Sequence, residues 1–299
     1  MSKPPPSYGD VTAEYEAART GHGSVSELWD LVWFGGADAV SFLEGLLSQN
    51  IAAMQPGEVR RSFLLGPKGK LTALLWALRD VDRVGLLTDA GYGQVVADSL
   101  GRYRIRVDVT IDHDERALTT DVGPESPETV GWEDTTELEA GLPLAGSRRR
   151  VSSGAPSGTP VGALGWTAVR VESGEPLMGV DVDENTIPHE TGLVPDAVDF
   201  TKGCFLGQEL VARIDSRGHV NRSLRGLIVT TNVLPPSGVE VATDEKPVGR
   251  FTSPAESLAL RAPVGLSLLR REVAAGDRVT IRWDGGEAPA VVADLPMVG

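Results

Sequence analysis

A tight turn between two apolar segments is the feature that most constrains how this chain can fold. Residues 61–65 and 71–78 are predicted to be strands, and Gly66-Pro67-Lys68-Gly69 joins them. Proline presets the backbone of the second position in such a turn. Two strands joined in this way pair antiparallel, so we expect an antiparallel sheet.

A helix is expected before this hairpin, and strands and a helix are expected after it. The elements predicted nearby are a helix over residues 38–47, a strand over 84–88, a helix over 92–100 and a strand over 103–111. In the last of these, Arg104 and Arg106 alternate with apolar residues. This order favours an α+β fold with an antiparallel sheet over a doubly wound fold.

The second half of the chain contains a loop-rich stretch and a run of short strands. Residues 121–162 are rich in Pro, Gly, Ser and Thr and predict a long, partly mobile excursion, in which Arg148-Arg149-Arg150 is a solvated loop. Short strands with turn signals predict a small β-barrel at the C-terminus. These strands cover residues 226–230, 239–242, 247–252, 262–269 and 278–283. The expected division is residues 1–115 and 116–222 as two α+β regions, which can interleave, and 223–299 as the barrel.

Composition excludes several classes of protein. The net charge of −14 argues against a nonspecific grip on DNA, which needs clustered Lys and Arg. One cysteine excludes an internal disulfide framework and a cluster held by this chain's own cysteines. The scattered histidines give no zinc spacing, so no metal site is expected. The N-terminal segment lacks the apolar core of a signal peptide, and no segment approaches the length of a membrane span. A cytoplasmic protein is expected.

The single cysteine, Cys204, lies in the run Lys202-Gly203-Cys204-Phe205-Leu206-Gly207-Gln208-Glu209. A helix is predicted to begin near Gly207 or Gln208. A helix N-terminus and a nearby ammonium both favour thiolate over thiol, which makes Cys204 a candidate reactive residue. The two glycines allow backbone shapes or close approaches that a side chain would block. The alternative is that the cysteine is a small buried apolar residue.

This run and its continuation through Arg222 resemble the signature of YgfZ-type folate-binding proteins. Those proteins are relatives of the glycine-cleavage T-protein, an aminomethyltransferase, and act in iron–sulfur cluster assembly and repair. The pattern Lys-Gly-Cys-aromatic-x-Gly-Gln-Glu, followed by Arg-Gly-His-x-Asn-Arg, is met at every defined position. Phe205 stands where the family often has tyrosine. Looser similarity covers residues 46–50, 65–70, 172–176 and 179–188.

The resemblance implies a T-protein-like fold, with two α+β regions and a C-terminal barrel around a central channel. The channel would bind tetrahydrofolate, with Cys204 near its mouth. The implied role is maintenance of iron–sulfur enzymes, including enzymes that modify tRNA, and the implied partners are iron–sulfur client or assembly proteins. The expected catalytic residues are Cys204 and Lys202. The expected folate-binding residues are Glu172, Gly203, Gly207, Gln208, Glu209, Arg213 and Arg217, with Arg104 and Arg106 as further candidates for the glutamate tail.

Two alternatives remain open at this point. In the T-protein family a carboxylate just after the hairpin turn helps to activate the folate nitrogen. Residues 70–75 hold no Asp or Glu here, so proton transfer at that point loses its acid–base group. A folate-dependent aminomethyl or methyl transferase is therefore the second hypothesis, ranked below the first because this group is missing. A third is a non-enzymatic scaffold that presents folate to a cluster-bearing partner.

Overall fold

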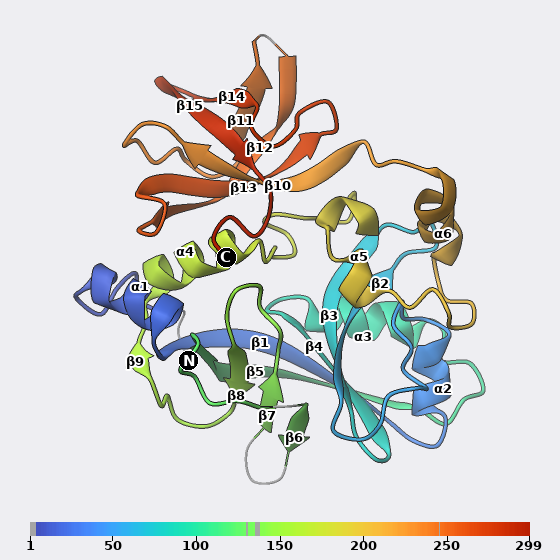
Figure 1. Cartoon of the computed structure of the whole chain (residues 1–299). Helices are drawn as coiled ribbons and strands as arrows, with labels where there is room; N and C mark the ends of the chain where they lie inside the picture. Colours follow the sequence, from blue (N-terminus) through green and yellow to red (C-terminus); the bar gives the residue numbers. More distant parts are fainter. Residues whose placement is uncertain (1–3, 130, 135–137, 245) are drawn as a thin grey trace.

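The computed structural model describes residues 4–129, 131–134, 138–244 and 246–299. It consists of a large, mostly antiparallel sheet with helices and of a closed barrel formed by the C-terminal part of the chain. In Figure 1 the barrel lies above the sheet, with α1 (Val11–Thr20) and α4 (Ala163–Ser173) between them on one side. The predicted α+β fold with a C-terminal barrel is confirmed.

The sheet is built around one long strand, β1. This strand pairs antiparallel with β4 on one side and with β5 on the other, and β9 (Thr159–Pro160) pairs parallel with its first residues. In sheet order the strands are β2 (Val59–Leu65), β3 (Leu71–Arg79), β4 (Arg83–Asp89), β1 (Gly23–Gly35), β5 (Thr110–Val122), β8 (Arg149–Ser152), β7 (Leu138–Gly141) and β6 (Trp132–Asp134). The predicted hairpin is therefore confirmed as β2 and β3.

Both faces of β1 are covered, which explains its nearly continuous run of buried residues. Successive side chains of a strand point to opposite faces. Val32 and Phe34 pack with α2 (Ala39–Glu44) and α3 (Gly93–Gly101). Trp29, Leu31 and Trp33 pack on the other face with Trp76 and Trp132, among others. The face rich in tryptophan is the one that turns towards the centre of the molecule.

The strand predicted over residues 103–111 is wrong for most of its length. Strand β5 begins only at Thr110, and Arg106 adopts a positive φ of 59°. The chain bends here because Asp108 is bonded to Asp38. The Asp108 N–H donates to the Asp38 carboxylate, and the Asp108 carbonyl oxygen accepts from the Asp38 N–H. Arg104 and Arg106 consequently lie on an exposed connection.

The stretch over residues 121–162 is not an excursion from the fold. It supplies β6, β7 and β8, which extend the sheet, and β9, which pairs with β1. The expectation that its arginine triplet is solvated is wrong for Arg149, whose side chain is only 3% exposed, and for Arg150, which pairs with Asp121 and Glu139. Buried partners far away in sequence stabilise these charges, and a local pattern cannot show them.

The division of the α+β part at residue 115 stays a prediction. Strand β5 spans that residue, and the same sheet continues from it into β8. The segment after α4 contains two short helices, η1 (Pro188–Thr191) and α5 (Val194–Ala197), and then α6 (Gln208–Arg217). The helix predicted after the cysteine is confirmed as α6.

The C-terminal barrel closes through a strand that the sequence pattern did not indicate. Strand β15 pairs with both β10 and β14, so no sheet edge remains. In order around the barrel the strands are β10 (Arg222–Val229), β13 (Ala262–Arg270), β12 (Lys246–Ser257), β11 (Val239–Thr243), β14 (Arg278–Trp283) and β15 (Gly286–Ala293).

A buried carboxylate joins α1, α4 and the barrel. Glu172 is fully buried and accepts hydrogen bonds from the Tyr15 hydroxyl at 2.7 Å and the Ser257 hydroxyl at 2.5 Å. The Arg19 guanidinium lies 3.8 Å from its other oxygen. Burial and the neighbouring Glu172 raise the pKa of Tyr15 to about 12, so the hydroxyl stays a donor at neutral pH.

Replacing Glu172 is expected to loosen this junction. Glu172→Ala leaves two buried hydroxyls without their acceptor and the Arg19 guanidinium without its countercharge, so the free energy of unfolding should fall by about 3 kcal/mol. Urea unfolding measures the change. Glu16→Ala, on the exposed side of α1, is the control and should shift stability by less than about 0.5 kcal/mol. Equal losses in the two variants would contradict this account.

Candidate functional site

A cavity of about 470 Å³, called the central cavity below, lies between the tryptophan-rich face of the sheet and α4. The tryptophan-rich face of the sheet, α4 and the chain after α4 form its walls, and Trp29, Trp76 and Trp166 are among its lining residues. Its size is within the range of small-molecule sites. The indole N–H of Trp29 is buried and has no hydrogen-bond partner among the described residues. An unsatisfied buried donor in a cavity wall is a position at which a ligand acceptor would be favourable.

Two arginines and a glutamate form a charged cluster on this wall. The Glu175 carboxylate accepts from Arg61 at 2.7 Å and from Arg149 at 3.2 Å, and both guanidinium groups lie over the ring of Trp76. These arginines hold the pKa of Glu175 below its usual value, although burial alone would raise it. A second cavity of about 580 Å³ also has Arg61, Trp76 and Glu175 in its lining. Arg61, Trp76 and Glu175 therefore line both cavities.

A second carboxylate of the cavity wall behaves differently. Asp89, the last residue of β4, accepts a hydrogen bond from the main-chain N–H of Met178 at 2.9 Å. Desolvation, with Glu175 adding repulsion, raises the pKa of the Asp89 carboxyl to about 6. A cavity-lining acid that titrates near neutrality is typical of ligand-binding and catalytic sites.

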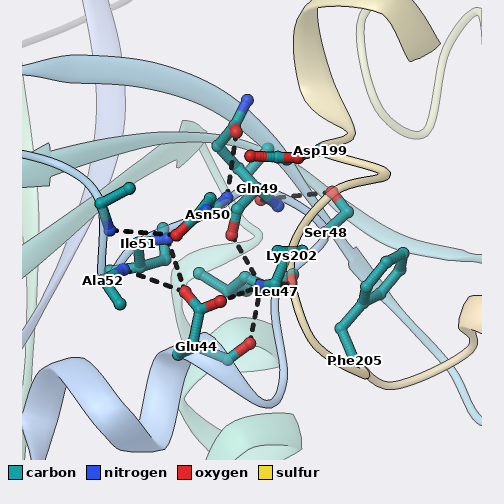
Figure 2. Close-up of polar contacts among 12 residues, drawn as sticks. Glu44, Leu47, Ser48, Gln49, Asn50, Ile51, Ala52, Asp199, Lys202 and Phe205 are labelled. Carbon is teal, nitrogen blue, oxygen red and sulfur yellow. Dashed lines mark hydrogen bonds and ion pairs between the residues drawn. The ribbon is translucent and has the colours of Figure 1, made fainter.

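The cysteine-containing segment lies elsewhere, at the end of α2 (Figure 2). The Lys202 ammonium is fully buried and donates to the carbonyl oxygens of Glu44, Leu47 and Gln49 at 2.6–2.8 Å. The Glu44 carboxylate lies 3.3 Å from it and also accepts from two main-chain N–H groups, those of residues 51 and 52. Burial lowers the pKa of Lys202 against the opposing effect of Glu44. The ammonium thus ties residues 199–205 to the loop that follows α2.

The second glycine of the motif is required by packing. Gly207 has a φ of 78°, and a Cβ there would lie 2.8 Å from the Gly66 carbonyl oxygen and 2.9 Å from the Gly69 Cα. Gly69 has a φ of 71° and faces Leu210 of α6 equally closely. The hairpin turn and the start of α6 therefore touch backbone to backbone, which only glycine allows at both positions.

The first glycine and the cysteine have no such role. Cys204 is a free, exposed thiol, and a Cβ on Gly203 would meet no atom within 4 Å among the described residues. Phe205, by contrast, is buried in the cluster that also contains Phe63 and Leu71. The segment is thus held by Lys202, Phe205 and Gly207 and presents Gly203 and Cys204 to solvent.

The remaining predicted site residues do not gather around the cavity. Glu209 and Arg213 form an exposed ion pair along α6, and the Gln208 amide oxygen accepts from the Phe205 N–H at 3.3 Å. The side chain of Arg217 lies outside the part of the chain that the structure describes. None of the predicted site residues is among those that line the central cavity, Glu172 included. Their direct contact with a ligand stays a prediction.

Sequence reasoning missed the residues that do line the cavity. Glu175 lies within the stretch 172–176 used for the family resemblance, but its importance comes from Arg61 and Arg149, which are far away in sequence. Over the described residues, no group of three His, Cys, Asp or Glu side chains is placed to hold a metal ion. No helix in the described part of the chain is long and apolar enough to cross a membrane.

Comparison with known proteins finds similarity to aminomethyltransferases and to an iron–sulfur cluster assembly factor. Residues 222–298 match the glycine cleavage T-protein C-terminal barrel domain. An aminomethyltransferase of Frankia alni is 28% identical over 96% of this chain and 89% of its own length. The human mitochondrial iron–sulfur cluster assembly factor IBA57 is 28% identical over 87% of this chain and 80% of its own length.

The fold agrees with these similarities. The crystal structure of glycine cleavage system aminomethyltransferase T from Bartonella henselae superposes with a TM-score of 0.84 and 21% identity, over 96% of this chain and 89% of that one. The fold is thus T-protein-like, as expected from the sequence motif. The chain is therefore similar to aminomethyltransferases over nearly its whole length, and residues 222–298 match the C-terminal barrel domain of the glycine cleavage T-protein.

Proposed function

We propose that this protein binds tetrahydrofolate in the central cavity and supports the assembly or repair of iron–sulfur enzymes. The observation that carries the folate part is the composition of the cavity wall. Tryptophans form apolar surfaces for a flat ring, and the unpaired Trp29 N–H offers a donor. Arg61 lines both cavities and Arg149 lines the central one, and arginine binds carboxylates such as those of a glutamate tail.

The iron–sulfur part of the proposal rests on a relative and on the exposed thiol. The similarity to the human assembly factor supports it, and so does the position of Cys204 on the surface, where a partner could reach it. A chain with one cysteine cannot hold a cluster with its own thiolates, so the cluster would belong to the partner. Enzymes that modify tRNA are candidate clients, and a cytoplasmic location is part of the proposal.

The second candidate function is folate-dependent aminomethyl or methyl transfer. It is favoured by the aminomethyltransferases that match nearly the whole chain. The lack of a carboxylate in residues 70–75 argues against it, because that group would activate the folate nitrogen. Formation of methylenetetrahydrofolate from an aminomethyl or methylamine donor would establish the transferase instead.

Calorimetry under anaerobic conditions tests the folate part. We expect tetrahydrofolate to bind with micromolar affinity to the wild type and equally to Cys204→Ala, because the thiol is not among the residues that line the cavity. Absence of binding to the wild type would overturn the folate part. A large loss of affinity in the variant would show that the thiol contacts the ligand, against the geometry described above.

A complementation experiment tests the role of the thiol. In cells that lack the native copy, Cys204→Ala should fail to restore client-enzyme activity while the purified variant keeps wild-type stability, since the side chain is exposed. Restored activity would remove the thiol from the proposal.

Lys202→Met should fail for a different reason. It leaves three carbonyl oxygens without a donor, and its free energy of unfolding should fall by about 3 kcal/mol. Lys68→Met, in the exposed hairpin turn, is the control and should stay within about 0.5 kcal/mol of the wild type. Urea unfolding measures both variants. A stable Lys202→Met protein would contradict the anchoring role.

A further inference from the structure

Asp89 occupies a position in the sheet that bears on the missing carboxylate. In the pairing of β3 with β4, Trp76 stands opposite Leu87 and Ala77 opposite Leu86. Continuing this register by two residues brings Asp89 opposite Leu74, and both side chains line the cavity. The Thr88 hydroxyl donates to the Leu74 carbonyl oxygen at 2.8 Å, which holds the strands together at this point. The neighbouring strand β4 thus brings a carboxylate beside residue 74, although residues 70–75 hold none.

The other carboxylates of the cavity wall are already paired. Both oxygens of Glu27 accept hydrogen bonds, from the Thr120 hydroxyl and from the Trp166 N–H, each at 2.6 Å. Both oxygens of Glu175 accept from arginine. Asp89 differs because only its Oδ2 has a partner among the described residues, the Met178 N–H, while Oδ1 has none.

We propose that Asp89 is the carboxylate that accepts the paired N–H donors of the pterin ring, its ring N–H and 2-amino group. This assignment rests on the proposed binding of folate. A carboxylate has about four lone-pair sites, so Oδ1 and the second site of Oδ2 together can accept two parallel donors. The tryptophans of the cavity supply the apolar surfaces for the ring. Asp89, unlike Glu172, is among the residues that line the cavity.

The assignment makes binding depend on pH. The charged and titratable groups around Asp89 are Glu27 of β1, Tyr92 before α3, Arg170 of α4 and Glu175 after α4. Burial raises the pKa of free Asp89 to about 6, whereas donors bound to its charged form would lower that pKa. Binding therefore favours the ionised carboxyl. Affinity is therefore full well above pH 6 and falls as the pH drops through 6.

Anaerobic calorimetry with tetrahydrofolate at pH 7.5 and pH 5.0 tests the assignment. For the wild type we expect about a tenfold loss of affinity at the lower pH, because only about a tenth of a carboxyl with a pKa near 6 is ionised at pH 5.0. For Asp89→Asn we expect about a hundredfold weaker binding at pH 7.5, because the amide replaces one acceptor by a donor and removes the charge. The pH dependence over this interval should disappear in that variant.

Asp82→Asn is the matched control, since Asp82 is exposed in the turn that joins β3 to β4 and carries the same charge. It should bind as the wild type does at both pH values. Wild-type-like affinity in Asp89→Asn, or a flat wild-type pH profile, would overturn the assignment and leave the proposed function standing. Absence of tetrahydrofolate binding by the wild type would overturn both. The wild-type profile requires no substitution, so a variant that fails to fold cannot hide the answer.

Discussion

The buried ammonium of Lys202 is the interaction on which the cysteine-containing surface depends. Burying a charge costs free energy unless its hydrogen-bonding capacity is met. Here three carbonyl oxygens at the end of α2 take its three protons, and Glu44 supplies the countercharge (Figure 2). The Glu44 carbonyl belongs to the last residue of α2, where it would otherwise lack a donor, and the carbonyls of Leu47 and Gln49 lie in the loop that follows. One side chain therefore joins the end of α2, the loop after it and the cysteine-containing segment.

This arrangement divides the most recognisable motif of the chain into two kinds of residue. Lys202, Phe205 and Gly207 are explained by burial and by the close approach of the hairpin turn. Gly203 and Cys204 are exposed and contribute to none of these contacts. The three packed residues thus hold Gly203 and Cys204 in place on the surface. Packing alone accounts for Lys202, Phe205 and Gly207, whereas it gives no role to Gly203 and Cys204.

Local patterns predicted the elements whose causes are local. The hairpin has its turn residues, α6 has its glycine start, and most barrel strands have turn signals. Where the deciding contact is distant, prediction failed. The bend at Asp108 depends on Asp38, and the burial of Arg149 depends on Glu175 and Trp76. The residues that line the cavity could not be predicted for the same reason, because its wall combines β1, β3, β4, β8 and α4.

The cavity and the cysteine segment are separate, yet a short path of contacts connects them. Glu175 on the cavity wall pairs with Arg61, whose carbonyl oxygen accepts from the Gln49 amide at 3.3 Å. The Gln49 carbonyl oxygen in turn accepts from Lys202 at 2.8 Å, two residues from the thiol. Contiguous hydrogen bonds and ion pairs therefore join the cavity wall to the cysteine segment. A ligand carboxylate that drew Arg61 away from Glu175 would break the first contact of this path.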